Sequence, residues 1–126
     1  MTKVLVVEDN YMNMVLVRDL LSASGYTVSE AENGQKALDL VATDRPDIIV
    51  MDLHLPEMDG TTAMKRLKAE ETTRNIPIVA LTASAMRGDE DKILDNGFDG
   101  YVPKPVNRRV LLDVLETNLK YSKSRY

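Results

Sequence analysis

Short apolar runs alternate with longer stretches of helical period along the whole chain, and this alternation constrains the fold more than any other feature. The strand-like runs cover residues 4–7, 27–31, 47–51, 78–81 and 98–102. The first and third of these runs are almost entirely apolar, as expected of strands buried on both faces of a sheet. Five such βα units predict an α/β protein with one parallel sheet, helices on both of its faces and right-handed crossovers.

The stretches between these runs carry the signals of helices. Asn10 and Asn33 stand where an N-cap is expected, each followed by apolar residues at helical spacing. Residues 85–96 have few apolar anchors, so we expect their helix to be weakly held. These anchors are Met86, Ile93 and Leu94. The last helix has well-spaced apolar residues from 106 to 119, and a basic, polar tail that we expect to be frayed follows it.

Composition and charge exclude several classes of protein. A chain of 126 residues with 44% hydrophobic content can form one core of ordinary size, and its net charge of -4 argues against a nucleic-acid binder. It has no cysteine, which excludes disulfides and thiol chemistry. We see no signal peptide, and no apolar run approaches the roughly 20 residues of a membrane span. We therefore expect a soluble cytoplasmic protein with one domain over residues 1–120, a short basic tail over 121–126 and no output domain.

Reactive side chains stand at the carboxyl ends of four of the five expected strands. They are Glu8 and Asp9 after the first strand, Asp52 after the third, Thr82 after the fourth and Lys104 after the fifth. Open parallel sheets bind ligands at this edge, where the strand order reverses. If the first strand is central and flanked by the second and third, Asp9 and Asp52 meet at that point.

This combination of side chains favours phosphoryl chemistry. Carboxylates that converge in one cleft repel each other unless a cation neutralises them, and Mg²⁺ prefers such oxygen ligands. The carboxylate of Asp52 is the candidate nucleophile, because an aspartate can form an acyl phosphate. We assign the metal site to Glu8 and Asp9, the phosphate-binding cation to Lys104 and the phosphate-binding hydroxyl to Thr82.

These motifs, in this order and at these spacings, resemble the CheY-like receiver domain of two-component response regulators. The matching residues are Glu8-Asp9, Asp52 with Pro56 and Gly60, Thr82-Ala83, and Lys104-Pro105. The resemblance extends from residue 3 to about residue 119. It implies the flavodoxin-like fold, an α/β doubly wound (βα)5 parallel sheet of five strands in the order 2-1-3-4-5.

The resemblance also implies roles for individual residues. Asp52 would accept a phosphoryl group from a histidine of a partner histidine kinase or histidine phosphotransfer protein. Mg²⁺ would be bound by Asp9, Asp52 and the backbone carbonyl of His54, with Glu8 acting mostly through water. These residues would make the phosphorylation and metal site.

Other residues would orient the site and transmit its state. Thr82 would turn inward on phosphorylation, and Tyr101 would follow it as the switch aromatic. A cis peptide between Lys104 and Pro105 would orient the lysine. The face formed by the weakly held helix, the Tyr101 strand and the last helix would then contact a downstream protein target.

Within the family, the chain is similar to single-domain regulators of the cell cycle, and also to receiver domains of hybrid histidine kinases. The similarity lies in residues 7–10 with Asn13, in Thr82-Ala83 and in residues 86–89. We favour a stand-alone receiver that signals through protein contacts, without direct binding to nucleic acid or insertion into a membrane. It would be a switch, not an enzyme, and would catalyse only its own phosphorylation and dephosphorylation.

Three alternatives stay open. The chain could be a phosphorelay intermediate that passes its phosphoryl group to a phosphotransfer protein, or a receiver domain cut from a hybrid histidine kinase. A Mg²⁺-dependent phosphohydrolase is disfavoured, because His54 stands where such enzymes commonly carry a second carboxylate, two residues after the nucleophile.

Each of these side chains also has a purely structural interpretation. Glu8 and Asp9 could favour the N-terminus of the next helix through its dipole, Thr82 could be a turn hydroxyl, and Lys104 a solvated loop lysine. Tyr101 could belong to the core, and His54 could be a solvent-exposed loop residue. The complete set of motifs at these spacings favours the functional interpretation.

Overall fold

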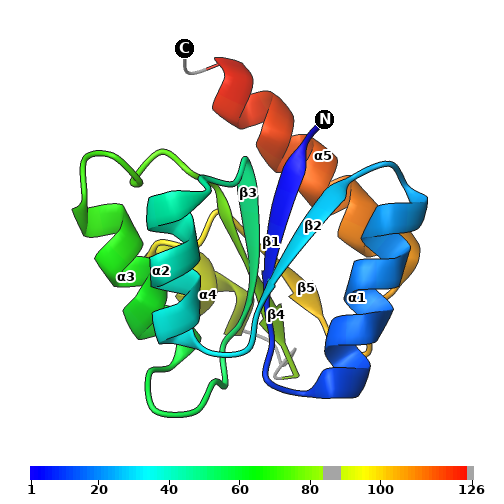
Figure 1. The fold of residues 1–126 in the computed structure, drawn as a ribbon, viewed down its shortest axis with the longest axis horizontal. Helices are drawn as coiled ribbons and strands as arrows, with labels where there is room; N and C mark the ends of the chain where they lie inside the picture. Colours follow the sequence, from blue (N-terminus) through cyan, green and yellow to red (C-terminus); the bar gives the residue numbers. More distant parts are fainter. Residues whose placement is uncertain (84–88, 125–126) are drawn as a thin grey trace.

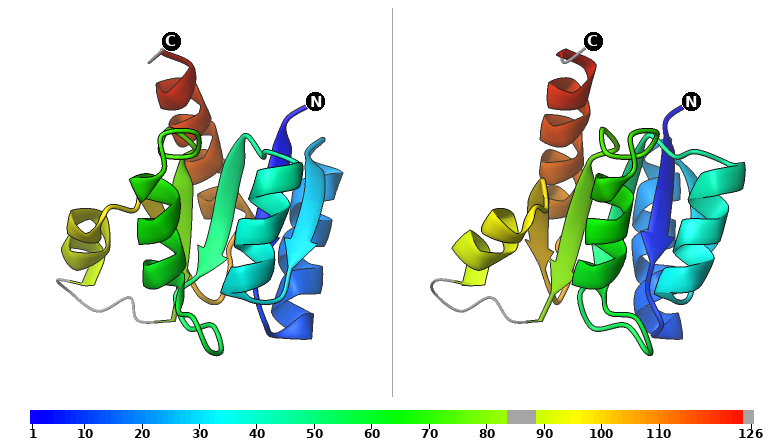
Figure 2. Two further views of the ribbon diagram at one scale, coloured as in Figure 1. Left: turned by 60° about the vertical axis from the view of Figure 1, so that its left-hand side comes forward. Right: turned by 90° about the vertical axis from the view of Figure 1, so that its left-hand side faces the viewer.

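A parallel sheet of five strands forms the centre of the protein. The computed structural model describes residues 1–83 and 89–124, and orders the strands β2-β1-β3-β4-β5, as predicted. Figure 1 shows the sheet between two layers of helices, and Figure 2 shows the strands running in one direction, so that their carboxyl ends share one edge. The strands are β1 (Lys3–Val7), β2 (Thr27–Ala31), β3 (Ile48–Asp52), β4 (Ile78–Thr82) and β5 (Gly100–Pro103).

Helices cover both faces of this sheet. α2, α3 and α4 lie on one face, and α1 and α5 on the other (Figure 1). The helices are α1 (Tyr11–Ala23), α2 (Gly34–Thr43), α3 (Gly60–Ala69), α4 (Asp89–Asn96) and α5 (Arg108–Ser124). In the part of the chain that the structure describes, no helix is both long enough and apolar enough to cross a membrane.

The continuous apolar runs are explained by this double covering. In β1, Leu5 and Val7 belong to the core under α2, α3 and α4, whereas Val4 and Val6 belong to the core under α1 and α5. β3 and β4 alternate in the same way, and all five residues of each are buried. β2, at the sheet edge, is mostly half-buried or exposed, in line with its weaker pattern.

Polar side chains begin the helices where the sequence predicted them. Asn10 accepts a hydrogen bond from the Asn13 N–H group at 3.0 Å, and Asn33 accepts one from the Lys36 N–H group at 2.8 Å. Asp59 makes the equivalent contact at the start of α3, a cap that we did not predict. These caps satisfy backbone N–H groups that have no partner within the helix.

The boundaries of the last elements differ from those predicted. β5 begins at Gly100 instead of Phe98, because the Phe98 N–H group donates to the Ile93 carbonyl and so closes the end of α4. α4 is described from Asp89 onward, and the predicted start at residue 85, with Met86, lies outside the described residues. α5 continues to Ser124, so residues 121–124 of the expected tail belong to this helix.

A partly buried ion pair ties two elements and a loop together at the edge opposite the carboxyl ends. The Lys68 ammonium lies 2.7 Å from the Asp99 carboxylate and 2.9 Å from the Ile76 carbonyl, and it also bonds the Arg74 carbonyl. The same Asp99 oxygen accepts a hydrogen bond from the Ile78 N–H group at the start of β4. The pair therefore joins α3, β4 and the loop before β5.

Replacing Lys68 with methionine should lower the free energy of unfolding by about 2 kcal/mol, the usual cost of losing hydrogen bonds to a charged group. The substitution keeps most of the side-chain volume but leaves two carbonyls and Asp99 without their cation. Urea unfolding measures the change, and Lys65→Met, at an exposed position of the same helix, is the control. Equal midpoints for the two variants would contradict the role given to the ion pair.

Candidate functional site

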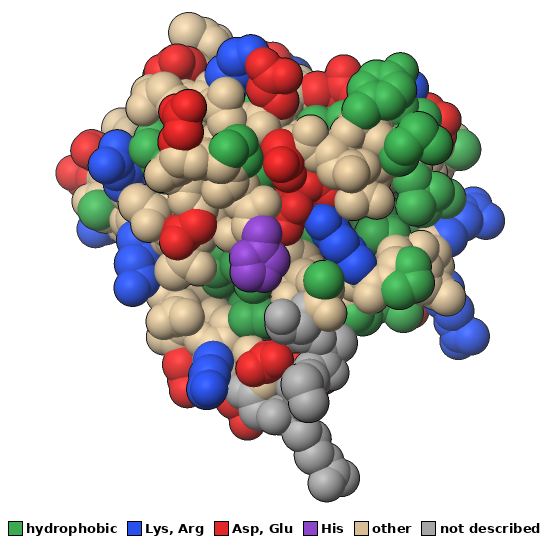
Figure 3. Space-filling model, turned by 90° about the horizontal axis from the view of Figure 1, so that it is seen from below, with side chains coloured by type: hydrophobic (Ala, Val, Ile, Leu, Met, Phe, Trp, Pro, Cys, Tyr) green, Lys and Arg blue, Asp and Glu red, His purple; other side chains and the backbone are tan. Residues whose placement is uncertain are grey.

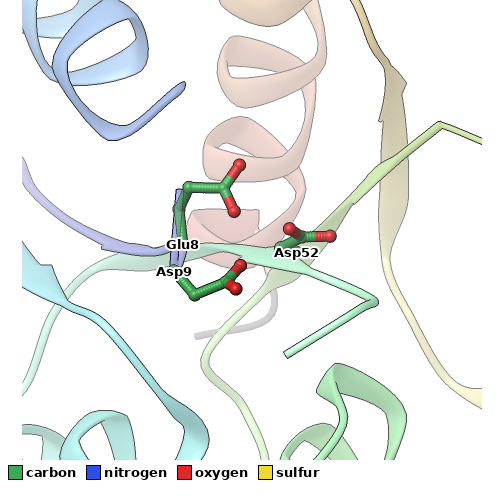
Figure 4. Close-up of side chains that lie close together, drawn as sticks. All are labelled: Glu8, Asp9 and Asp52. Carbon is green, nitrogen blue, oxygen red and sulfur yellow. The ribbon is translucent and has the colours of Figure 1, made fainter. Parts of the chain in front are cut away.

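Three carboxylates converge at the carboxyl ends of β1 and β3. Glu8, Asp9 and Asp52 each offer one oxygen, and these oxygens all lie within 4.8 Å of one another. Figure 4 shows the three side chains at neighbouring strand ends, and Figure 3 shows acidic side chains near the centre of this face of the molecule, beside a basic one. Because β1 and β3 are paired in the sheet, the strand order itself brings the carboxylates together.

Burial differs sharply among the three carboxylates. Glu8 and Asp52 are only 2% and 4% exposed, whereas Asp9 is exposed. The Glu8 N–H group donates to the Ala31 carbonyl and continues the pairing of β1 with β2, so the chain is still extended at Glu8. Adjacent side chains of an extended chain point to opposite sides, which places Glu8 inward and Asp9 outward.

Lys104 joins the two buried carboxylates. Its ammonium lies 2.8 Å from Glu8 Oε1 and 2.9 Å from Asp52 Oδ2. The peptide bond between Lys104 and Pro105 is cis, as the resemblance implied, and the Lys104 N–H group donates to the Thr82 carbonyl at 2.7 Å. The lysine is therefore held in place by the hydrogen bond of its backbone to Thr82 and by the two carboxylates that its ammonium contacts.

The backbone around Asp52 is packed so closely that only glycine fits at position 60. Asp52 Oδ1 accepts a hydrogen bond from the His54 N–H group at 3.0 Å, and the Gly60 N–H group donates to the Leu53 carbonyl at 3.0 Å. A Cβ atom at Gly60 would lie 2.2 Å from the Asp52 carbonyl oxygen. The start of α3 thus supports the end of β3 directly.

The electrostatics of the cluster shift the pKa values of its two buried carboxyl groups in opposite directions. Burial, reinforced by the neighbouring Asp52 carboxylate, raises the pKa of Glu8 to about 7, although Lys104 opposes the shift. Burial alone would also raise the pKa of Asp52, but the Glu8 carboxyl, the His54 N–H group and Lys104 together hold this pKa below its usual value. Burial would lower the pKa of Lys104, but its two carboxylate partners raise it. Asp52 is therefore the ionised member of the buried pair.

The structure gathers four of the predicted site residues, Glu8, Asp9, Asp52 and Lys104, into one cluster, and places the other three outside it. Thr82 ends β4 and is fully buried, next to the strand that carries Asp52. His54 is exposed and lines a separate cavity of about 170 Å³ with Thr82. Tyr101 lies outside the cluster, half-buried on β5 in a groove beside α4 and α5. Gly60 matched a family motif, but nothing in the sequence indicated its contact with the Asp52 backbone.

Comparison with known proteins decides the family. The family model described as "Response regulator receiver domain" matches residues 4–116. The chain belongs to this family. Among curated relatives of the receiver, the polar-differentiation response regulator DivK of Brucella anthropi is 44% identical over 116 residues, which span 92% of this chain and 94% of the relative.

Solved structures of receivers have the same fold. The receiver domain of a sensor histidine kinase from Pseudomonas aeruginosa, described with a magnesium ion coordinated in its active-site cleft, has a TM-score of 0.86 and 35% identity, covering 94% of this chain and 98% of that one. The chemotaxis response regulator CheY4 of Vibrio cholerae has a TM-score of 0.86 and 30% identity, with the same coverage. The predicted flavodoxin-like receiver fold is confirmed.

Proposed function

We propose that this receiver is a phosphorylation switch in which Asp52 accepts a phosphoryl group from a phosphohistidine of a partner histidine kinase or phosphotransfer protein. The contact of Lys104 with both Glu8 and Asp52, inside the acidic cluster, carries this proposal. An ionised Asp52 is ready to act as the nucleophile, and the lysine stands where phosphoryl oxygens would need a cation.

In the transfer step the phosphoryl group would pass directly from the partner's histidine to Asp52. An Asp52 carboxylate oxygen attacks phosphorus as the bond from phosphorus to the imidazole nitrogen breaks, and the electron pair of that bond stays on the histidine. Lys104 would orient the phosphoryl oxygens, and the His54 N–H group would hold the other oxygen of Asp52. The protein acts by positioning and by stabilising charge.

The acidic cluster fits a divalent cation. Glu8, Asp9 and Asp52 supply hard oxygen ligands within 4.8 Å of one another, the donor set that Mg²⁺ prefers, and the carbonyl of His54 would complete it. A bound Mg²⁺ would neutralise the carboxylates and the incoming phosphoryl oxygens. Among the chain's own groups, Lys104 provides the other positive charge at this point.

The output of the switch would be a changed surface. Thr82, buried at the end of β4, would contact a phosphoryl oxygen, and Tyr101 on β5 would change its position in response. Phosphorylation would then bias a two-state element toward contact with a protein target at the face of α4, β5 and α5. In this proposal the chain acts in the cytoplasm, without substrate turnover, membrane insertion or direct contact with nucleic acid.

Incubation with Mg²⁺ and acetyl phosphate, followed by intact mass measurement, tests the proposal. We expect the wild type to gain one phosphoryl group, and expect no gain with EDTA or in Asp52→Asn, which lacks the nucleophilic oxygen. Asp95→Asn, an exposed position on α4, is the control and should be phosphorylated like the wild type. A gain that persists in Asp52→Asn would contradict the assignment.

A further inference from the structure

A groove runs between α4, β5 and α5, away from the carboxylate cluster. Its volume is about 450 Å³. Leu94 on α4 and Val110 on α5 are 44% and 37% exposed, which is unusual for side chains of this kind in this protein, and both line it. Tyr101 and Val114 add further apolar lining.

The described charged groups of the groove all have one sign. They are Glu90, Asp99 and Asp113, and among the residues that the structure describes no lysine, arginine or histidine lines the groove. Asp99 is neutralised by Lys68 at 2.7 Å. Glu90 and Asp113, in contrast, form no ion pair with any side chain described in residues 1–83 and 89–120. Glu90 accepts a hydrogen bond from the Tyr101 hydroxyl, which leaves its negative charge unneutralised.

The helix beside the groove, α4, adds to this negative charge. The eight residues of α4 hold four carboxylates and one lysine. Three of the carboxylates, including Glu90, lie in the first turn, and Ile93 is the one buried residue of the helix. The groove therefore combines an apolar floor with carboxylates on both of its helical walls.

We propose that this groove binds a cationic amphipathic helix of a protein partner. The apolar face of such a helix would cover Leu94, Tyr101 and Val110, and lysine or arginine side chains at its flanks would pair with Glu90 on one wall and Asp113 on the other. The inference rests on the proposed function in one respect, that a protein target docks at this face. It adds that the docking segment of this target is a helix with an apolar face and positive charge.

The same charges disfavour two other occupants. A second copy of the chain that docked through the same groove would add its own Glu90 and Asp113 to the interface, and like charges in one interface oppose association. Nucleic acid would bring phosphates to the same carboxylates. Since no described residue brings positive charge to the groove, we expect the partner to supply it.

Two labelled peptides test the proposal directly. One is an 18-residue amphipathic helix of about equal numbers of leucine and lysine, and the other has glutamate in place of each lysine, with apolar faces long enough to cover a groove of this kind. Fluorescence anisotropy with the unphosphorylated wild type should detect binding of the lysine peptide, weakening as salt increases. Equal or tighter binding of the glutamate peptide would overturn the proposal.

Variants locate the binding site on the protein. Leu94→Ser and Val110→Ser should each weaken binding about fivefold, because each removes apolar contact area. The double variant with Glu90→Gln and Asp113→Asn should weaken it about tenfold and flatten the salt dependence. Circular dichroism verifies that these surface variants are folded.

Matched substitutions outside the groove control for the acidic surface as a whole. Met12→Ser removes an exposed apolar side chain of α1, and Asp95→Asn removes a carboxylate of α4 that does not line the groove. Both should bind the lysine peptide like the wild type. If Asp95→Asn weakens binding as much as the groove variants do, or if the wild type dimerises in a way that Leu94→Ser abolishes, the proposal is wrong.

The two proposals fail separately in these measurements. Peptide binding to the unphosphorylated chain needs no phosphoryl group, so it tests the groove even if Asp52 is never modified. The groove variants should still gain a phosphoryl group from acetyl phosphate, because none of their residues contacts the carboxylate cluster. A wild type that binds the peptide but gains no phosphoryl group from any donor would overturn the proposed function alone.

Discussion

Replacing Gly60 with alanine is expected to lower the free energy of unfolding by about 3 kcal/mol, at the upper end of the usual cost of overpacking. The added Cβ atom would lie 2.2 Å from the Asp52 carbonyl oxygen and 3.0 Å from Leu53 Cα. Both neighbours are backbone atoms, so neither can turn away as the end of a side chain could. Alanine is a better helix former than glycine by about 1 kcal/mol, which offsets only part of this cost.

The same substitution should slow phosphorylation, because the clash pushes on the residue that carries the nucleophile. Urea unfolding measures the stability, and the rate of mass gain with acetyl phosphate measures the effect on Asp52. Gly25→Ala is a suitable control: Gly25 has a φ of 92° but no atom within 4 Å of an added Cβ. It should cost only about 1 kcal/mol of backbone strain and leave phosphorylation unchanged. Wild-type stability in Gly60→Ala would show that α3 can move away from β3.

Periodicity in the sequence was sufficient to predict the sheet and the edge that carries the site. The apolar runs ending at Val7, Met51 and Leu81 could be identified because both sides of each strand are buried under helices. The reactive residues could then be placed at the carboxyl ends from their position in the chain alone. Their convergence required the strand order, which the family resemblance supplied and the structure confirmed.

Contacts made between distant segments could not be predicted in this way. Lys104 and Glu8 are separated by 96 positions, and their ion pair reaches across the ends of β3 and β4, which lie between β1 and β5 in the sheet. Glu8 and Asp9 are adjacent acids with opposite burial, and only the continued strand pairing at Glu8 distinguishes them. The contact of Gly60 with Asp52 depends on the path of the loop between them. Local composition carries no signal for any of these.

Without a divalent cation, the protein is expected to lose stability as the pH rises from about 5 to about 8. The pKa of Glu8 is raised from 4.5 to about 7 in the folded protein. A carboxyl with a raised pKa in the folded state stabilises it fully below the unfolded pKa, and this contribution is lost as the pH rises through the folded value. The loss should be of the order of 2 kcal/mol, since burying an ionised Glu8 beside Asp52 is what becomes unfavourable.

The lowered pKa of Asp52 does not cancel this slope. A group with a lowered pKa stabilises the folded state above its unfolded pKa, here near 3.8, so its contribution is already complete at pH 5. The window between pH 5 and pH 8 therefore reports on Glu8. Glu8→Gln, which stays neutral throughout, should flatten the profile of unfolding free energy against pH in this window.

Magnesium should reverse the effect at high pH, because a cation and a proton compete for the same carboxylates. Adding millimolar Mg²⁺ should therefore raise the urea midpoint of unfolding more at pH 8 than at pH 5. The gain in the free energy of unfolding equals the free energy of Mg²⁺ binding to the folded state. Asp9→Asn should lose this response but keep the pH dependence, since Asp9 is exposed and belongs to the acidic cluster without sharing the ion pair with Lys104. Urea unfolding at a series of pH values, with EDTA or Mg²⁺, measures both effects. If Glu8→Gln retained the wild-type slope, the proton would have to reside on another group.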